Sequence, residues 1–209
     1  MKPPTDIQTA YQNYVLQHGH RPASVRAFAE SLDMEERVFY EHFSSFPHIE
    51  QALFLRFFEQ ATERLEGSPE YEAYGTPEKL LALFYTWIEV LTGERSFLVF
   101  LQHEYGSGCG GASYTEGTGE EFRLFVKSIL KEGMANGEVA DRLFVPRYYR
   151  DVFWLEAKGI LRFWLRDNSK NFEKTDALIE KTVRFSYDII RPNTLDSGLD
   201  LIKYMWQNR

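Results

Sequence analysis

The chain has a single cysteine, Cys109, and no long apolar run, and each absence excludes a class of protein. One cysteine cannot form an internal disulfide, which excludes the small secreted domains that disulfides hold together. No stretch approaches the 18 uninterrupted apolar residues that indicate a transmembrane helix, so we expect no membrane span. Residues 1–12 lack the apolar segment of a signal peptide. These features predict a soluble cytoplasmic protein.

Positive charge is also scarce, most notably near the N-terminus. The whole chain carries a net charge of −7, and residues 1–66 contain ten acidic and six basic side chains, a net charge of −4. A DNA-binding domain is usually basic, because neutralising the phosphates supplies most of its affinity. The N-terminal third of the chain is therefore an unusual candidate for binding nucleic acid.

What the sequence does contain is helical periodicity along most of its length. Strand-type alternation is not sustained anywhere, and Pro and Gly fall at the edges of the periodic segments. The pattern predicts an all-α protein of about nine or ten helices. These are expected near residues 5–18, 24–31, 35–42, 47–66, 76–91, 96–105, 120–136, 146–167, 175–191 and 195–207.

One segment, "EGSPEYEAYGTPEK", is the only plausible linker. It divides the chain into a small N-terminal head, residues 1–66, and a larger C-terminal body, residues 67–209. Thr76 is expected to cap the helix that follows, with Pro77 in its first turn. The glycine-rich stretch 106–119, which contains Cys109, is the longest predicted loop, and the sequence leaves its role open.

Within the head, the stretch "SVRAFAESLDMEERVFYEHF" has the spacing of a helix-turn-helix. Ser24 is an expected N-cap for a short helix that ends near Ser31. Asp33 is expected at the turn, because aspartate tolerates left-handed backbone and also caps helices well. A third helix then covers residues 35–42.

Residues 24–54 and the order of the helices resemble the TetR family of transcriptional regulators. Phe39, Tyr40, His42 and Phe43 match the "LYxHF" stretch of that family's recognition helix, and Ile49 belongs to the apolar positions of its fourth helix. The resemblance implies a ligand-responsive regulator, a repressor that reads operator DNA with its third helix and has a helical body. The candidate contact residues are Arg26, Glu35, Glu36, Arg37, Tyr40 and His42.

The sequence also departs from the family in that same helix. The small or polar residues that precede the family's Thr-Leu-Tyr are Glu35, Glu36 and Arg37 here, its Thr is Val38, and its helix-four Lys is Phe46. Two interpretations therefore stay open. Either Arg37 and its neighbours contact base edges, or the head has kept its packing residues while its acidic surface no longer binds DNA. In the second case the protein is a ligand- or protein-binding module.

The body is rich in aromatic residues that could line a cavity for a small apolar or aromatic effector. Each of them could equally fill the core. The candidate pocket residues are Trp87, Phe100, Phe125, Tyr149, Phe153 and Trp154. The helices near 146–167 and 173–191 carry wide apolar stripes, which predict a homodimer joined through a four-helix interface.

Catalysis and metal binding find little support. His103, Glu104 and Cys109 lie close in sequence, but their spacing fits no zinc motif. The glycine-rich stretch lacks the Gly-Lys-Ser/Thr ending of a phosphate loop, and no nucleophile–base pair is apparent. We therefore expect neither a catalytic site nor a cofactor or metal.

Overall fold

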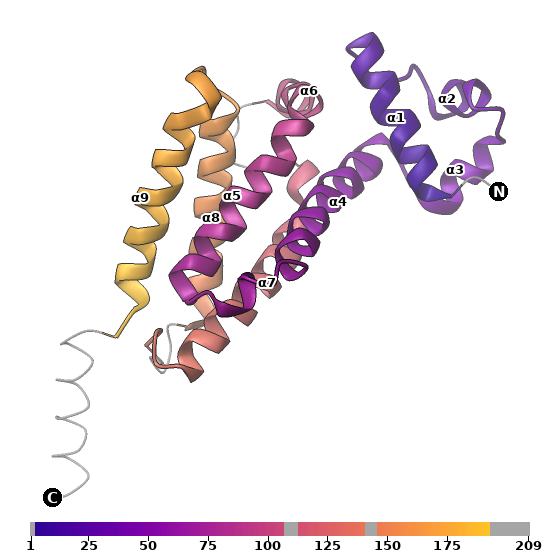
Figure 1. Cartoon of the computed structure of the whole chain (residues 1–209). Coiled ribbons are helices and arrows are strands. Elements are labelled where there is room, and N and C mark those ends of the chain that lie inside the picture. Colours follow the sequence, from indigo (N-terminus) through magenta and orange to yellow (C-terminus); the bar gives the residue numbers. More distant parts are fainter. Residues whose placement is uncertain (1–2, 107–112, 141–145, 193–209) are drawn as a thin grey trace, which may run out of the picture. The chain divides into compact units, whose positions relative to one another are not determined.

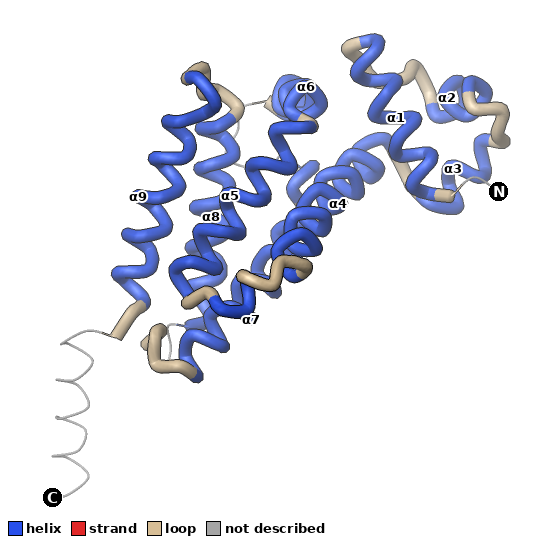
Figure 2. The backbone as a smooth tube through the Cα atoms, viewed as in Figure 1, coloured by secondary structure: helices blue, strands red, loops and turns tan. Residues whose placement is uncertain are grey.

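The computed structural model describes residues 3–106, 113–140 and 146–192, and these residues contain helices but no strands (Figure 2). The predicted all-α fold is confirmed. The helices are α1 (Pro4–His18), α2 (Val25–Ser31), α3 (Glu36–His42), α4 (Phe46–Glu66), α5 (Thr76–Gly93), α6 (Arg95–Tyr105), α7 (Thr118–Ala135), α8 (Pro146–Trp164) and α9 (Glu173–Ile190). Short 3₁₀ turns lie at Tyr71–Ala73, Ser113–Thr115 and Lys170–Phe172. The helix predicted near 195–207 and the thiol of Cys109 lie outside the described residues.

Local chemistry explains the start and the end of α2. The Ser24 hydroxyl accepts a hydrogen bond from the Ala27 amide at 3.1 Å, as expected for an N-cap. Asp33 occupies the left-handed region at φ 51°, as predicted for the turn residue between α2 and α3. Thr76 behaves differently from the prediction, since it is the first residue of α5 and its hydroxyl donates to Glu138 at 2.7 Å.

The chain divides into two compact units. Residues 1–63 and 87–120 form unit 1, and residues 64–86 and 121–209 form unit 2, so the boundaries fall inside α4, α5 and α7. The division into a head of 1–66 and a body of 67–209 is a division by function and stays a prediction. None of the helices in the described ranges is long and apolar enough to cross a membrane.

The helix-turn-helix in unit 1 is held by a cluster of aromatic rings. Phe28 of α2 lies edge-on to both Tyr11 of α1 and Phe39 of α3, with centroids 5.8 and 6.3 Å apart. Phe46, at the start of α4, stacks on Tyr11 at 5.2 Å. Phe39 is fully buried, so the packing fixes which side of α3 faces outward.

In unit 2, α8 and α9 lie side by side and are joined by a tight connection (Figure 1). Helix α8 ends at Trp164, three residues earlier than predicted, because the following residues close this connection. The buried Asp167 carboxylate accepts hydrogen bonds from the hydroxyls of Ser169 and Thr175, at 2.6 and 2.7 Å, and from their amides. Burial would raise the pKa of Asp167, but these four donors outweigh it and lower the pKa.

Candidate nucleic-acid interface

Helix α3 presents a polar face on the side opposite its buried ring. Successive helical residues are rotated by about 100°, so Arg37 lies opposite Phe39, while Tyr40 and Glu41 return to the same side as Arg37. Arg37, Tyr40 and Glu41 are exposed, whereas Phe39 is fully buried. This is the arrangement a recognition helix needs, with its packing residues turned inward and its candidate contact residues turned to solvent.

The two arginines predicted to contact DNA are each paired with a carboxylate of the head. Arg26 of α2 donates from Nε to Glu30 at 2.9 Å, and Arg37 donates from Nε to Glu35 at 2.7 Å. All four side chains are at least 65% exposed. Each pair is locally neutral, so the positive potential of this surface is weak and solvent screens it further.

The other candidate contact residues differ in how far they reach the surface. Tyr40 is 53% exposed and touches Phe39 edge-on, so its hydroxyl is available to a phosphate or a base. Glu36, the first residue of α3, is half-buried. His42 is half-buried at the end of α3, and its Nε2 is a buried atom with no hydrogen-bond partner in the described part of the chain.

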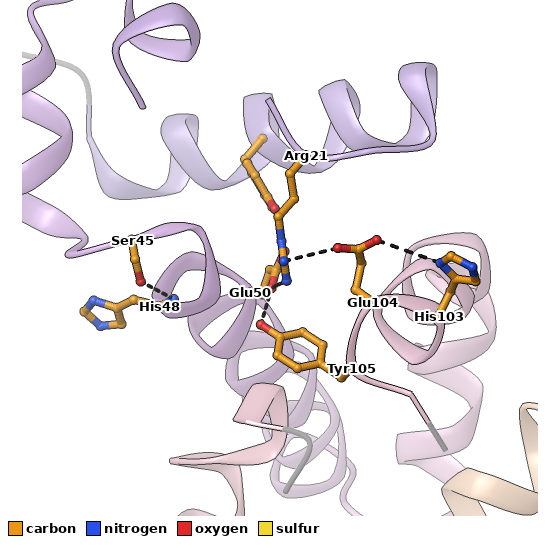
Figure 3. Close-up of polar contacts among 8 residues, drawn as sticks. Arg21, Ser45, His48, Glu50, His103, Glu104 and Tyr105 are labelled. Atoms are coloured by element: carbon orange, nitrogen blue, oxygen red, sulfur yellow. Dashed lines mark hydrogen bonds and ion pairs between the residues drawn. The ribbon is translucent and has the colours of Figure 1, made fainter. Parts of the chain in front are cut away.

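A buried polar cluster joins the predicted head to α6 (Figure 3). Glu50 of α4 is fully buried and accepts from Tyr11 at 2.5 Å and from Arg21 Nε and Nη2 at 2.9 and 2.8 Å. The hydroxyl of Tyr105, the last residue of α6, also donates to Glu50. Arg21 reaches Glu104 of the same helix through Nη1 at 3.1 Å. One carboxylate thus connects α1, the α1–α2 loop, α4 and α6.

Electrostatics in this cluster favour a charged Arg21 beside a neutral Tyr11. Hydrogen bonding to Glu50 raises the pKa of Arg21, and burial, followed by the charge of Glu50, raises the pKa of Tyr11. A second link between α1 and the start of α6 is the hydrogen bond from Gln12 to Glu94. Sequence reasoning did not find the cluster. A signal was present, because Glu50 interrupts the buried stripe of α4 beside Ile49, and a buried carboxylate needs partners.

The predicted pocket residues are distributed over both compact units. Trp87 is buried in unit 1 against Phe54 and Phe58, with centroids 5.8 and 5.3 Å apart. Phe100, also in unit 1, is half-buried and stacks on Phe97 at 6.2 Å.

The four pocket candidates of unit 2 come from α7 and α8. Tyr149, Phe153 and Trp154 are buried, while Phe125 is half-buried. Trp154 contacts Phe122 of α7 at 5.3 Å. Trp87, Phe100 and Trp154 therefore pack on neighbouring rings of their own unit, and a cavity lined by all six residues stays a prediction.

An open pocket of about 670 Å³ lies elsewhere, where α8 ends and α9 begins. It is lined by Gly159, Arg162, Phe163, Arg166, Asp167, Asn168, Ser169 and Lys174. No cluster of three or more potential metal ligands occurs among the described residues. His103 is 88% exposed and lies 3.8 Å from Glu104, with Nδ1 facing the carboxylate.

Comparison with known proteins identifies the family. The family profile described as "Tetracyclin repressor-like, C-terminal domain" matches residues 79–205, more than half of the chain. No curated protein sequence gives a significant match.

Solved structures resemble the chain along most of its length. Thermus thermophilus FadR, a TetR-family repressor in complex with lauroyl-CoA, is 15% identical with a TM-score of 0.65, covering 92% of this chain and 98% of its own. Bacillus subtilis FadR in complex with stearoyl-CoA is 17% identical with a TM-score of 0.61, covering 87% and 98%. NalD, a repressor of a multidrug efflux pump in Pseudomonas aeruginosa, is 18% identical with a TM-score of 0.57, covering 88% and 96%.

These structures share the fold, and the family profile shows the relationship in sequence. The family resemblance of residues 24–54 is confirmed by this match to residues 79–205. Membership of the family also supports the expectation that the protein is not an enzyme. The chain belongs to the tetracyclin repressor-like (TetR) family.

Proposed function

We propose that the protein is a repressor that binds operator DNA as a homodimer, with α3 of each subunit in the major groove. The observation that supports this most directly is the packing of α3. Because Phe39 is buried against Phe28, the Arg37 and Tyr40 side chains face solvent on one side of the helix. Residues at the start of such a helix contact base edges in helix-turn-helix proteins.

The charge of the head sets the kind of binding to expect. Of the six basic residues in 1–66, Arg21 is tied to Glu50, while Arg26 and Arg37 are paired on the surface. If each head neutralises about two phosphates, a dimer has a salt slope of about −4 on a log–log plot, well below that of a strongly basic reader. We therefore expect weak non-specific binding, with discrimination carried by contacts to the bases.

A specific observation keeps the alternative in view. Arg26 and Arg37 are each paired with a glutamate of the head, and further glutamates lie in α3. The same surface is expected of a head that no longer binds DNA. In that case the protein would be a helical ligand- or protein-binding module with a structural head. The two proposals differ in one measurable property, the enrichment of a DNA sequence.

The deciding experiment is selection from a random-sequence DNA pool at low salt, followed by titration of the enriched site. We expect a palindromic site whose half-sites are about one helical turn apart. Arg37→Ala should weaken binding to that site by about tenfold or more, the loss of one bidentate base contact. If no sequence is enriched, with or without candidate effectors, the head is structural and the alternative holds.

The homodimer is proposed on the exposed apolar faces of α8 and α9. Leu155 of α8 and Phe185 of α9 are 67% and 68% exposed. Around them lie further exposed large apolar side chains, namely Tyr148, Val152, Phe163 and Ile189. On α8, residues 148, 152, 155 and 163 recur at helical spacing and form one stripe. An exposed apolar surface of this kind on adjacent helices is typical of a subunit interface.

Light scattering at micromolar concentration tests this interface. Leu155→Lys and Phe185→Lys should each produce monomers, because both place a charge in the apolar contact. Leu124→Lys on α7 is the matched control, since Leu124 is 48% exposed and lies outside α8 and α9, and it should leave the dimer intact. A wild-type protein that is monomeric and unchanged by dilution would rule the homodimer out.

The effector is proposed to be a small molecule with a large apolar part, bound among the body's aromatic residues. Three buried rings of unit 2, Tyr149, Phe153 and Trp154, supply the apolar surroundings that such a ligand requires. The acyl-CoA complexes of two similar proteins make long-chain acyl compounds the first to test. Lauroyl-CoA should raise the melting temperature and release the selected DNA, while coenzyme A alone should do neither. An acyl compound that changes neither property is not the effector.

A further inference from the structure

On the proposed function that the head reads DNA, we infer that Glu35 and Arg37 act as one unit that recognises a G·C base pair. In this unit Glu35 is a positioning residue, because it holds the guanidinium of Arg37. The Glu35 carboxylate would then contribute to the sequence preference of α3, although its negative charge repels the DNA phosphates.

The geometry at the start of α3 supports this role for Glu35. Glu35 is the N-cap residue of α3 and has extended backbone, φ −70° and ψ 143°. Ser, Thr, Asp and Asn in this position commonly accept a hydrogen bond from an amide of the first turn. The Glu35 side chain makes no such capping bond, and its Oε2 accepts instead from Arg37 Nε at 2.7 Å.

The pair lies where a base edge could reach it. Arg37 is 76% exposed and Glu35 is 73% exposed, and both precede the buried Phe39 that anchors α3 to the core. The N-terminal residues of a recognition helix contact bases when the helix enters the major groove. Tyr40, one turn further along the same side as Arg37, would border the same contact.

The chemistry of the pair matches the edge of a G·C base pair. The bond from Nε to Glu35 does not use the end-on edge of the Arg37 guanidinium, which is formed by N–H groups of Nη1 and Nη2. They can donate to O6 and N7 of guanine, the most common specific contact of arginine in the major groove.

The arrangement also explains why a weak surface ion pair matters here. In water an exposed pair contributes little. When the groove covers it, water is excluded and the electrostatic attraction strengthens. An arginine already held in its binding geometry also loses less side-chain freedom on binding than a mobile one.

The test compares two glutamates that carry the same charge. Glu35→Ala and Glu41→Ala each remove one negative charge from an exposed position at or in α3. Each variant is titrated against the selected operator and against its single-base-pair substitutions, with circular dichroism as the control for folding. Removing a charge should tighten binding to every sequence about equally, and this is all that we expect of Glu41→Ala.

Glu35→Ala should do something more. We expect its preference for G·C at one position of each half-site to fall by about tenfold, which corresponds to about 1.4 kcal/mol. Because Glu35 acts through Arg37, the double variant Glu35→Ala/Arg37→Ala should have the same base preferences as Arg37→Ala alone.

Two outcomes have different meanings. If Glu35→Ala and Glu41→Ala change binding to all sequences alike, Glu35 is only a charge and the inference is wrong, although the head reads DNA. If the wild-type protein enriches no sequence at all, the proposed function itself has failed.

Discussion

Substitution of Glu50 should lower the free energy of unfolding more than substitution of any exposed glutamate of the head. Its carboxylate is fully buried and accepts hydrogen bonds from Tyr11, Arg21 and Tyr105. Glu50→Gln keeps the shape but removes the charge, so Arg21 loses its main partner. Removing one member of a buried ion pair costs about 3–5 kcal/mol. We expect about 3 kcal/mol here, because Arg21 is 28% exposed and keeps Glu104 at 3.1 Å.

Urea denaturation at fixed protein concentration measures this loss, since the stability of the proposed homodimer depends on concentration. Tyr105→Phe is the graded control and should cost about 1 kcal/mol, the usual contribution of one hydrogen bond. The double variant Arg21→Met/Glu50→Leu should recover stability relative to Glu50→Leu, because an apolar pair leaves no charge unpaired. A Glu50→Gln protein within about 0.5 kcal/mol of wild type, or a double variant no better than Glu50→Leu, would refute the reasoning.

The same variants test whether the cluster transmits the effector signal. Glu104 and Tyr105 belong to α6, whereas Arg21 and Glu50 belong to the predicted head, which contains α3. The cluster is therefore a direct contact between α6 and the head. In Tyr105→Phe the fold should survive, but effector-induced release of DNA should need more ligand than in wild type. An unchanged effector response in this variant would mean that the signal reaches the head by another route.

Two further predictions concern Gly133 and Glu156 of unit 2, with Gly93 of unit 1 as a control. Gly133→Ala should lower the free energy of unfolding by about 1–3 kcal/mol in urea denaturation, because its Cβ would collide with Thr76 Oγ1 and lie 2.7 Å from Val139 Cγ2. Gly93→Ala is the control and should be nearly neutral or slightly stabilising, because a Cβ there meets nothing within 4 Å. Burial raises the pKa of Glu156, and the hydrogen bond from Ser186 only partly offsets this effect. Its stabilising contribution is therefore fully present below its unfolded pKa and is lost as the pH rises through the raised folded value. Glu156→Gln should gain stability over wild type between pH 4.5 and pH 8, whereas a Glu121→Gln control on the exposed side of α7 should not.

Local sequence chemistry predicted the helix-turn-helix well. The cap at Ser24 and the turn at Asp33 depend on neighbouring residues alone, so one sequence is enough to place them. The end of α8 was missed, because it depends on Asp167 accepting from Thr175, eight residues away and in the next helix. Thr76 was assigned a capping role from its position before Pro77, but its hydroxyl bonds to Glu138, 62 residues later.

The candidate site shows the same division between local and long-range information. The outward positions of Arg37 and Tyr40 follow from helical periodicity around the buried Phe39. The pairing of Glu35 with Arg37 depends on a side-chain orientation, which periodicity does not specify. The Glu50 cluster joins residues far apart in the sequence, 55 positions for Glu50 and Tyr105 and 83 for Arg21 and Glu104, and only their common packing brings them together.

An acidic recognition helix is compatible with specific DNA binding. Charge repulsion lowers the affinity for every DNA sequence, whereas contacts to the bases set the preference among sequences. A carboxylate near the phosphates weakens binding to every sequence by a similar factor, so the ratio of specific to non-specific affinity is preserved. Glu36→Lys should therefore tighten binding to the selected operator and to a scrambled duplex by similar factors. In a dimer it should steepen the salt slope by about 2, one added phosphate contact per head. Fluorescence anisotropy at several salt concentrations measures both quantities. If both duplexes bind as before and the slope is unchanged, α3 does not face the DNA, and the acidic surface of the head has another use.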